Sequence, residues 1–145
     1  MKIAIGCDHG GYLLKQDVLV WLEEHDYDIE DVGCYSTESV DYPIYGEKVG
    51  RAVANGEADY GIVICTTGIG ISIAANKVKG IRCAHCTDSL SAEMCRRHNN
   101  ANVLAMGAGL TGTKMALRMV EVFLNTEFEG GRHQRRVNLL DNIQP

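Results

Sequence analysis

The sequence contains no apolar run long enough to cross a membrane: its apolar stretches have the length of single strands, whereas a membrane-spanning helix needs about 20 residues. The N-terminus turns polar at Asp8, too early for the apolar core of a signal peptide. Positive charge is also scarce, because 14 Lys and Arg stand against 19 Asp and Glu, a formal charge of −5. A negative chain disfavours generic nucleic-acid binding. We therefore expect a cytoplasmic protein with neither a membrane nor a nucleic-acid partner.

The cysteines lack the spacing of a zinc site. Cys83 and Cys86 form the one C-x-x-C pair, and they fall in an expected strand, where an offset of three places them on opposite faces. A zinc site would need a second C-x-x-C or an H-x-x-H, and a thioredoxin-type pair would need its first cysteine at a helix N-terminus. The sequence therefore predicts reduced thiols and no metal, with Cys7, Cys34, Cys83 and Cys95 serving as small apolar residues.

Apolar segments of strand length alternate with segments of helical periodicity along the chain. Strands are expected at residues 2–7, 27–32, 60–65, 81–86 and 102–106, and helices at 10–24, 42–55, 72–77, 89–98 and 112–124. A final helix at 132–143 lies outside this repeating unit. The alternation predicts a single α/β domain over residues 1–145, with a five-stranded, mostly parallel sheet between two helical layers and an extra C-terminal helix.

The strongest local signal is the segment C-T-T-G-I-G-I-S, which begins at Cys65 and ends at Ser72. In α/β folds of this kind, ligands bind beyond the carboxyl ends of the strands. Here a buried strand ends at a thiol and a glycine-rich turn opens a helix, so backbone N–H groups can face an anion and favour the thiolate. The segment is neither a P-loop nor a complete G-x-G-x-x-G, because position 73 is Ile. The alternative is a tight turn beside an inert cysteine.

Three other segments combine residue types suited to hydroxyls or anions. Asp8 and His9 follow the first strand and precede two glycines. His98 can act as a general acid or base near neutral pH, and Arg132 and Arg136 lie one helical turn apart, which suits a phosphate. Each segment also has an explanation without a function. Asp8 can cap a helix, His98 can lie at a helix C-terminus, where the helix dipole favours basic side chains, and Arg132 and Arg136 can belong to a solvent-exposed basic face.

Taken together and in this order, these segments resemble the ribose-5-phosphate isomerase B family, which also contains the galactose-6-phosphate isomerase subunits. The matching motifs are G-C-D-H-G-G at residues 6–11, S-V-D-Y-P at 39–43, G-I-V-I-C-x-T-G-I-G-I-S-I-A-A-N-K at 61–77, G-I-R at 80–82, R-x-H-N-x-x-N-V-L-A at 96–105 and E-G-G-R-H-x-x-R-V at 129–137. The resemblance covers essentially the whole chain. It implies a Rossmann-like sheet, a homodimer or tetramer with the active site at the subunit interface, and no metal or organic cofactor. The implied activity interconverts an aldose phosphate and a ketose phosphate, for example ribose 5-phosphate and ribulose 5-phosphate in the pentose phosphate pathway.

The resemblance also implies roles for residues at the matching positions. Cys65 would be the base that moves a proton between C1 and C2, His98 would assist opening of the furanose ring, and Thr67 would be the third catalytic residue. The resemblance implies that Asp8, Tyr42 and Asn99 contact the sugar, and that the amides of residues 67–72 contact the developing enediolate, with Thr66, Gly68, Ile69, Gly70 and Ser72 among the binding residues. It implies that His9, Arg132 and Arg136 hold the phosphate, with part of this set coming from the partner subunit.

Two positions depart from the family pattern. The family often has glycine where this chain has Thr66, and often has a phosphate-binding arginine where this chain has Gly109. Both departures favour, as an alternative, a six-carbon substrate such as galactose or allose 6-phosphate. A second alternative is a non-catalytic sugar-phosphate-binding protein, against which the retention of Cys65 and His98 argues.

Overall fold

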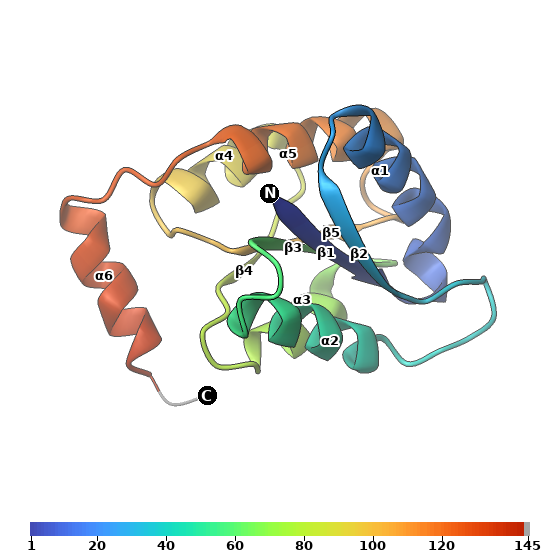
Figure 1. Cartoon of the computed structure of the whole chain (residues 1–145), viewed down its shortest axis with the longest axis horizontal. Helices are drawn as coiled ribbons and strands as arrows, with labels where there is room; N and C mark the ends of the chain where they lie inside the picture. The colour runs from blue at the N-terminus through green and yellow to red at the C-terminus, as the bar shows by residue number, and fades with distance from the viewer. Residues whose placement is uncertain (144–145) are drawn as a thin grey trace.

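The computed structural model describes residues 1–143 of the chain. In these residues, five strands run parallel in one sheet of order β2-β1-β3-β5-β4 (Figure 1). The strands are β1 (Lys2–Cys7), β2 (Asp28–Gly33), β3 (Tyr60–Cys65), β4 (Cys83–His85) and β5 (Val103–Gly107). The predicted five-stranded α/β fold is confirmed, and the sheet is wholly rather than mostly parallel. β3 reads Y-G-I-V-I-C because a central parallel strand is covered on both faces.

Two helical layers cover the sheet. The helices are α1 (Tyr12–Glu24), α2 (Tyr42–Ala54), α3 (Ile69–Asn76), α4 (Ser89–Arg97), α5 (Thr113–Asn125) and α6 (Arg132–Asp141), with a short 3-10 turn, η1 (His9–Gly11), before α1. α1, α4 and α5 lie on one face, α2 and α3 lie on the other, and α6 stands apart from both layers (Figure 1). No helix within residues 1–143 combines the length and apolar character needed to cross a membrane.

Alternation along the strands divides the core between these layers. Ile62 and Ile64 of β3 join the cluster beneath α1, α4 and α5, whereas Val63 and Cys65 join the cluster beneath α2 and α3. The loop after β1 leads to α1 and the loop after β3 leads to α3, so the two loops leave the sheet toward opposite faces. Adjacent parallel strands whose loops diverge in this way form the crevice where such folds bind ligands. Asp8 and Cys65 stand at that crevice.

Two elements differ from their predicted bounds. α3 begins at Ile69 rather than at residue 72, because Gly68 at φ +80° turns the chain directly into the helix. β4 covers three residues rather than residues 81–86, because side-chain hydrogen bonds take the place of strand–strand backbone hydrogen bonds just before it. The Arg82 N–H donates to the Asn102 side chain, and the Asn76 amide pairs with both backbone groups of Cys83.

Lys15 is fully buried on α1, which its place in the helical pattern did not predict. Its Nζ donates to Asp31 Oδ1 at 2.7 Å and to the Cys34 carbonyl at 2.6 Å, and it lies 5.1 Å from the centroid of the Tyr35 ring. A buried ammonium is tolerated only where it is paired and hydrogen-bonded. Lys15 therefore ties α1 to the end of β2 and to the start of the segment that leads to α2.

Replacing Lys15 with Met is expected to lower the free energy of unfolding by about 2–3 kcal/mol. The substitution keeps the apolar stem but removes the ammonium that, within residues 1–143, alone faces Asp31 and the Cys34 carbonyl. Asp31 is 26% exposed and so retains part of its hydration. Urea unfolding at a fixed protein concentration measures the loss. The matched control is Lys114→Met on exposed Lys114, which should change stability by less than about 0.5 kcal/mol. Equal unfolding midpoints for the two variants would contradict this role of Lys15.

Candidate functional site

The Cys65 thiol is the last group of β3, and its side chain is held by the loop that follows. The residue is 5% exposed, and its Sγ accepts a hydrogen bond from the Gly68 N–H at 3.1 Å. Gly68 is required here because a Cβ would lie 2.6 Å from the Met106 carbonyl carbon, in a backbone with φ +80°. A backbone N–H aimed at sulfur stabilises the thiolate form. The loop therefore places a backbone N–H donor on the Cys65 sulfur.

Three strand ends meet at this edge of the sheet. Thr66 lies between the loops that follow β1 and β5: a Cβ on Gly10 would lie 2.1 Å from Thr66 Oγ1, and the Gly109 N–H donates to the Thr66 carbonyl at 2.8 Å. The Ala108 N–H donates to the Cys65 carbonyl at 2.9 Å. The structure thus brings the Asp8 loop, the Cys65 loop and the turn after β5 into contact.

Asp8 and His9 both take part in local hydrogen bonds at this edge. Asp8 is 6% exposed and its Oδ1 accepts from the Gly11 N–H at 3.1 Å, which confirms the capping explanation for this carboxylate. His9 Nδ1 accepts from the Val40 N–H at 3.1 Å, which fixes the ring and leaves its Nε2 to carry the proton. Both side chains are therefore oriented by the fold, with Asp8 Oδ2 and His9 Nε2 without a protein partner among residues 1–143.

The amides at the start of α3 are divided between internal contacts and open positions. The Ser72 N–H donates to the Gly68 carbonyl and its hydroxyl to the Ile69 carbonyl, while the Ile69 N–H donates to Thr67 Oγ1. Among residues 1–143 the N–H groups of Gly70 and Ile71 have no such partner. The open amides are therefore those of Gly70 and Ile71, and the Ser72 amide assigned to the substrate is already engaged by the helix.

Tyr42, at the first position of α2, stands over these open amides. A Cβ on Gly70 would lie 2.6 Å from the Tyr42 ring, so the ring packs directly against the Gly70 backbone. The Tyr42 side chain is 40% exposed, and its hydroxyl has no partner among the described residues. This places a phenol beside the α3 N-terminus, as expected for a group that contacts a polar ligand there.

The remaining predicted residues lie at the opposite end of the sheet. Cys65 is level with Gly107, the last residue of β5, whereas His98 caps α4 before β5 begins. The length of β5, about 3.3 Å per residue, separates the two groups. Within one chain the structure therefore does not bring His98, Asn99, Arg132 and Arg136 to Cys65.

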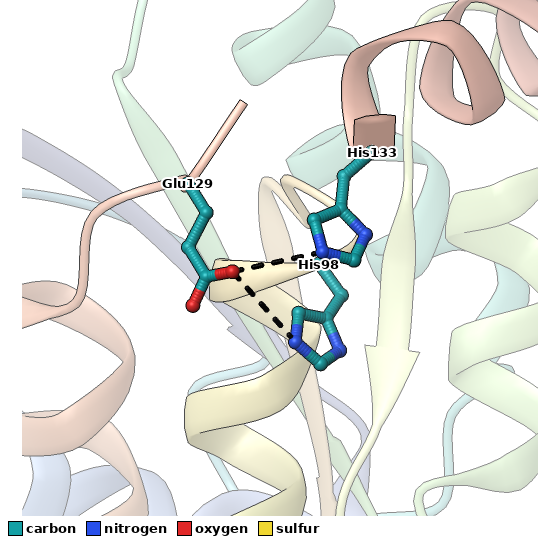
Figure 2. A group of neighbouring side chains, drawn as sticks. All are labelled: His98, Glu129 and His133. Atoms are coloured by element: carbon teal, nitrogen blue, oxygen red, sulfur yellow. Dashed lines mark ion pairs between the residues drawn. The ribbon is translucent and has the colours of Figure 1, made fainter. Parts of the chain in front are cut away.

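His98 belongs to a cluster with Glu129 and His133 (Figure 2). The two imidazole rings stack with centroids 4.4 Å apart and an interplanar angle of 12°. Glu129 Oε1 lies 3.6 Å from His133 Nε2 and 4.0 Å from His98 Nε2, and its Oε2 lies 3.4 Å from Arg97 Nη1. Desolvation, followed by the nearby His98 and Arg132, lowers the pKa of His133, so this imidazole is neutral at neutral pH.

These three side chains are also the group within residues 1–143 whose donor atoms come close enough to hold a metal, all within 4.8 Å of one another. The lone pairs of the imidazoles lie in the ring planes, and two nearly parallel planes cannot converge on one ion at bonding distance. Arg132 and Arg136 add positive charge that acts on His133. The cluster as arranged therefore suits an anion or a proton rather than a metal ion.

Arg132 and Arg136 lie on one face of α6, exposed and without an ion pair among residues 1–143. Asn99 is exposed and lines a cavity of about 440 Å³ between α6 and the α3–β4 connection. The far end of α6 is joined to the domain by an ion pair of 2.9 Å between Asp141 and Arg82. Arg132, Arg136 and Asn99 therefore lie in one region of the chain around α6, apart from Cys65.

The sequence interpretation left three residues in these regions without a role. Glu129 and His133 stand inside the last matching motif, and their position beside His98 is visible only in the structure. His85 was considered only as part of C-x-x-C, yet its Nε2 lies 2.8 Å from the Thr67 carbonyl. Its proximity to the loop follows from the parallel register of β4 with β5, which the short β4 run did not specify.

The two departures from the family pattern touch each other. A Cβ at Gly109 would lie 3.1 Å from Thr66 Cγ2 and 3.0 Å from the Thr66 carbonyl oxygen. The methyl group of Thr66 therefore occupies space beside the position where relatives often carry a longer side chain. Positions 66 and 109 form one packing unit in this chain, and with a side chain at position 109 Thr66 would have to shift by a few tenths of an ångström.

Comparison with known proteins shows which family the chain is similar to. The sequence model described as Ribose/Galactose Isomerase matches residues 3–140. Ribose-5-phosphate isomerase B of Escherichia coli is 48% identical over 143 residues, covering 99% of this chain and 96% of that protein. The structure of ribose-5-phosphate isomerase B from Clostridium thermocellum superposes with a TM-score of 0.98 at 53% identity, covering 99% of this chain and 97% of that one. A ribose 5-phosphate isomerase structure from Thermotoga maritima gives a TM-score of 0.96 at 46% identity over 98% of both chains. The chain therefore belongs to the ribose/galactose isomerase family.

Proposed function

We propose that this protein interconverts ribose 5-phosphate and ribulose 5-phosphate, with Cys65 as the base. The observation that carries the proposal is the Cys65 thiol beside the open amides of Gly70 and Ile71, at the crevice where folds of this type bind ligands. Relatives named ribose-5-phosphate isomerase B match over essentially the full chain. A C–H acid next to a carbonyl needs a positioned base and donors for the developing oxyanion, and this edge of the sheet supplies both.

The proton transfer follows from these groups. The Cys65 thiolate takes the proton from C2 of the open-chain aldose, and the electron pair left behind forms an enediolate with negative charge on O1. The Gly70 and Ile71 N–H groups and the α3 N-terminus stabilise that charge, at about 3–4 kcal/mol per donor. The thiol then returns its proton to C1, while the C2 hydroxyl becomes the carbonyl and its proton passes to O1. Asp8, Tyr42 and Thr67 orient the sugar hydroxyls during this step.

Ring opening and phosphate binding are assigned to the second half of the site. His98 moves the proton from the anomeric hydroxyl to the ring oxygen, next to a neutral His133 and the Glu129 carboxylate. Arg132, Arg136 and His9 hold the phosphate, and Asn99 orients the sugar. Two guanidiniums on one helix face suit a phosphate because each can donate two hydrogen bonds.

A homodimer would join the two halves, with Cys65 from one subunit and His98 from its partner. Support comes from the separation of the two groups within one chain and from the surface beside Cys65. Tyr42, Ile44, Ile69 and Ile73 are 40–55% exposed on α2 and α3, next to the loop that holds the thiol. Exposed apolar side chains gathered in this way are typical of an interface. The proposed setting is the cytoplasm, where six unpaired cysteines stay reduced.

A six-carbon sugar phosphate is the second candidate substrate. The observation that favours it is the Thr66–Gly109 packing unit, which replaces a possible cationic contact with a methyl group. The third candidate, a non-catalytic binding protein, keeps the same contacts but no chemistry.

Cys65→Ala is expected to reduce kcat for ribose 5-phosphate by roughly 10²–10⁴-fold, because removal of the base leaves only binding and the oxyanion donors. Formation of ribulose 5-phosphate, followed spectroscopically without added metal, measures the change. The control is Cys95→Ala, a buried cysteine of α4 outside the proposed site, which should keep near-normal turnover per folded protein. Full activity in Cys65→Ala would exclude this thiol as the base.

Mixed dimers test whether two subunits build the site. Cys65→Ala and His98→Asn chains, co-expressed with different tags, should give parent homodimers that are nearly inactive. A purified mixed dimer should recover about half of the wild-type activity, because one of its two sites combines an intact Cys65 with an intact His98. An inactive mixed dimer with normal association would place both residues in one subunit's site.

A substrate panel of ribose, allose and galactose phosphates separates the three candidate functions. We expect kcat/KM for ribose 5-phosphate to exceed the values for both hexose 6-phosphates by at least about 10-fold, the discrimination that a fitted pocket achieves for one extra carbon unit. The reverse order would favour the hexose substrate. Binding of all three without turnover would favour the non-catalytic protein.

A further inference from the structure

His85 ends β4 and reaches the loop that holds Cys65. Its Nε2 lies 2.8 Å from the Thr67 carbonyl oxygen, and its Cδ2 would lie 2.8 Å from a Cβ at Gly68. A carbonyl oxygen only accepts, so the ring must donate, and Nε2 carries a proton. His85 falls between the matching motifs at residues 80–82 and 96–105, and the proposed mechanism does not use it.

The contact acts on the same peptide group that reaches the sulfur. The Thr67 carbonyl and the Gly68 N–H are the two ends of one planar trans peptide and point in opposite directions. One end accepts from His85, and the other donates to Cys65 Sγ at 3.1 Å. The imidazole, the peptide and the thiol therefore form a continuous chain of hydrogen bonds.

Two physical effects pass along this chain. A donor on the carbonyl polarises the amide and strengthens its N–H as a donor, by about 10–30% per bond. The donor also fixes the orientation of a peptide that precedes a glycine at φ +80°, where the backbone has little side-chain restraint. Both effects keep the Gly68 N–H on the sulfur and favour its negative form.

We propose that His85 is a positioning residue for Cys65, whose hydrogen bond to the Thr67 carbonyl holds the Thr67–Gly68 peptide with its N–H on the sulfur and thereby stabilises the thiolate. The effect on the thiol is independent of substrate. Only its consequence for turnover rests on the proposed function.

Several ionisable groups lie on the segments around the thiol. They are Cys7, Asp8 and His9 at the end of β1, Asp41, Tyr42, Tyr45, Glu47, Lys48 and Arg51 at the start of and along α2, and Cys83 and His85 on β4. Among residues 1–143 the hydrogen bond to Cys65 Sγ comes from Gly68 alone. Replacing His85 therefore leaves the other groups in place while it removes the contact to the peptide.

The test compares three variants at one position. Gln places an N–H donor near the position of His Nε2, Asn is too short to reach the Thr67 carbonyl, and Leu has no donor. Iodoacetamide labelling of Cys65 is measured against pH in substrate-free protein, with peptide mass spectrometry to separate Cys65 from the other five cysteines. His85→Gln is the matched control, since it keeps the donor but cannot carry the positive charge of an imidazolium.

We expect His85→Asn and His85→Leu to move the labelling midpoint up by about half a pH unit and to slow labelling at pH 7 about threefold, the same free-energy change in both measures. His85→Gln should match the wild type. The acidic limb of kcat/KM should shift with the labelling midpoint, while KM changes less than about twofold.

Three results would overturn the proposal. Unchanged midpoints in the Asn and Leu variants would show that the peptide needs no support from His85. A Gln variant as impaired as the Leu variant, with normal thermal unfolding, would show that the imidazole ring or its charge matters rather than the hydrogen bond. A large rise in KM at a fixed midpoint would make His85 a substrate contact. If Cys65→Ala keeps full turnover, the proposed function fails, and the labelling result still stands on its own.

Discussion

The hydrogen bond from the Gly68 N–H to Cys65 Sγ is the contact on which the rest of the site depends. It exists because the chain turns at Gly68, a left-handed residue three positions after the end of β3, and enters α3 at the next residue, Ile69. The same turn leaves the Gly70 and Ile71 amides open and brings Thr66 against the loops after β1 and β5. A single backbone conformation thus positions the proposed base, the proposed oxyanion donors and the neighbouring loops.

The parallel sheet supplies the rigid support for that conformation. The order β2-β1-β3-β5-β4 places the ends of β1, β3 and β5 at one edge, and hydrogen bonds from Ala108 and Gly109 join the turn after β5 to Cys65 and Thr66. At the side of the crevice, buried Lys15 joins α1 to the segment after β2. Loops held at both ends in this way keep the Cys65 side chain and the neighbouring amides in fixed positions.

The charge distribution follows the same division into two halves. The chain is acidic overall, yet within residues 1–143 Arg132 and Arg136 have no ion pair; they lie on α6 beside a neutral His133, at the end of the sheet opposite to Cys65. An anionic substrate would be attracted to this region, while the proposed proton transfer would take place beside Cys65, where the amides are open. The length of β5 prevents one chain from closing this distance, which is the physical reason for expecting a second subunit.

The sequence by itself determined the α/β fold, the parallel sheet and the candidate base, because strand length, helical spacing and the glycine-rich turn after Cys65 are local signals. It left the bounds of α3 and β4 inexact, since Gly68 and the side chains of Asn76 and Asn102 define them through specific hydrogen bonds. Tertiary structure alone decided that Lys15 is buried, that Thr66 packs on Gly109, that His85 reaches Thr67, and that His98 lies far from Cys65 in the same chain. These are contacts between residues distant in sequence, and the register of the strands fixes them rather than any local preference.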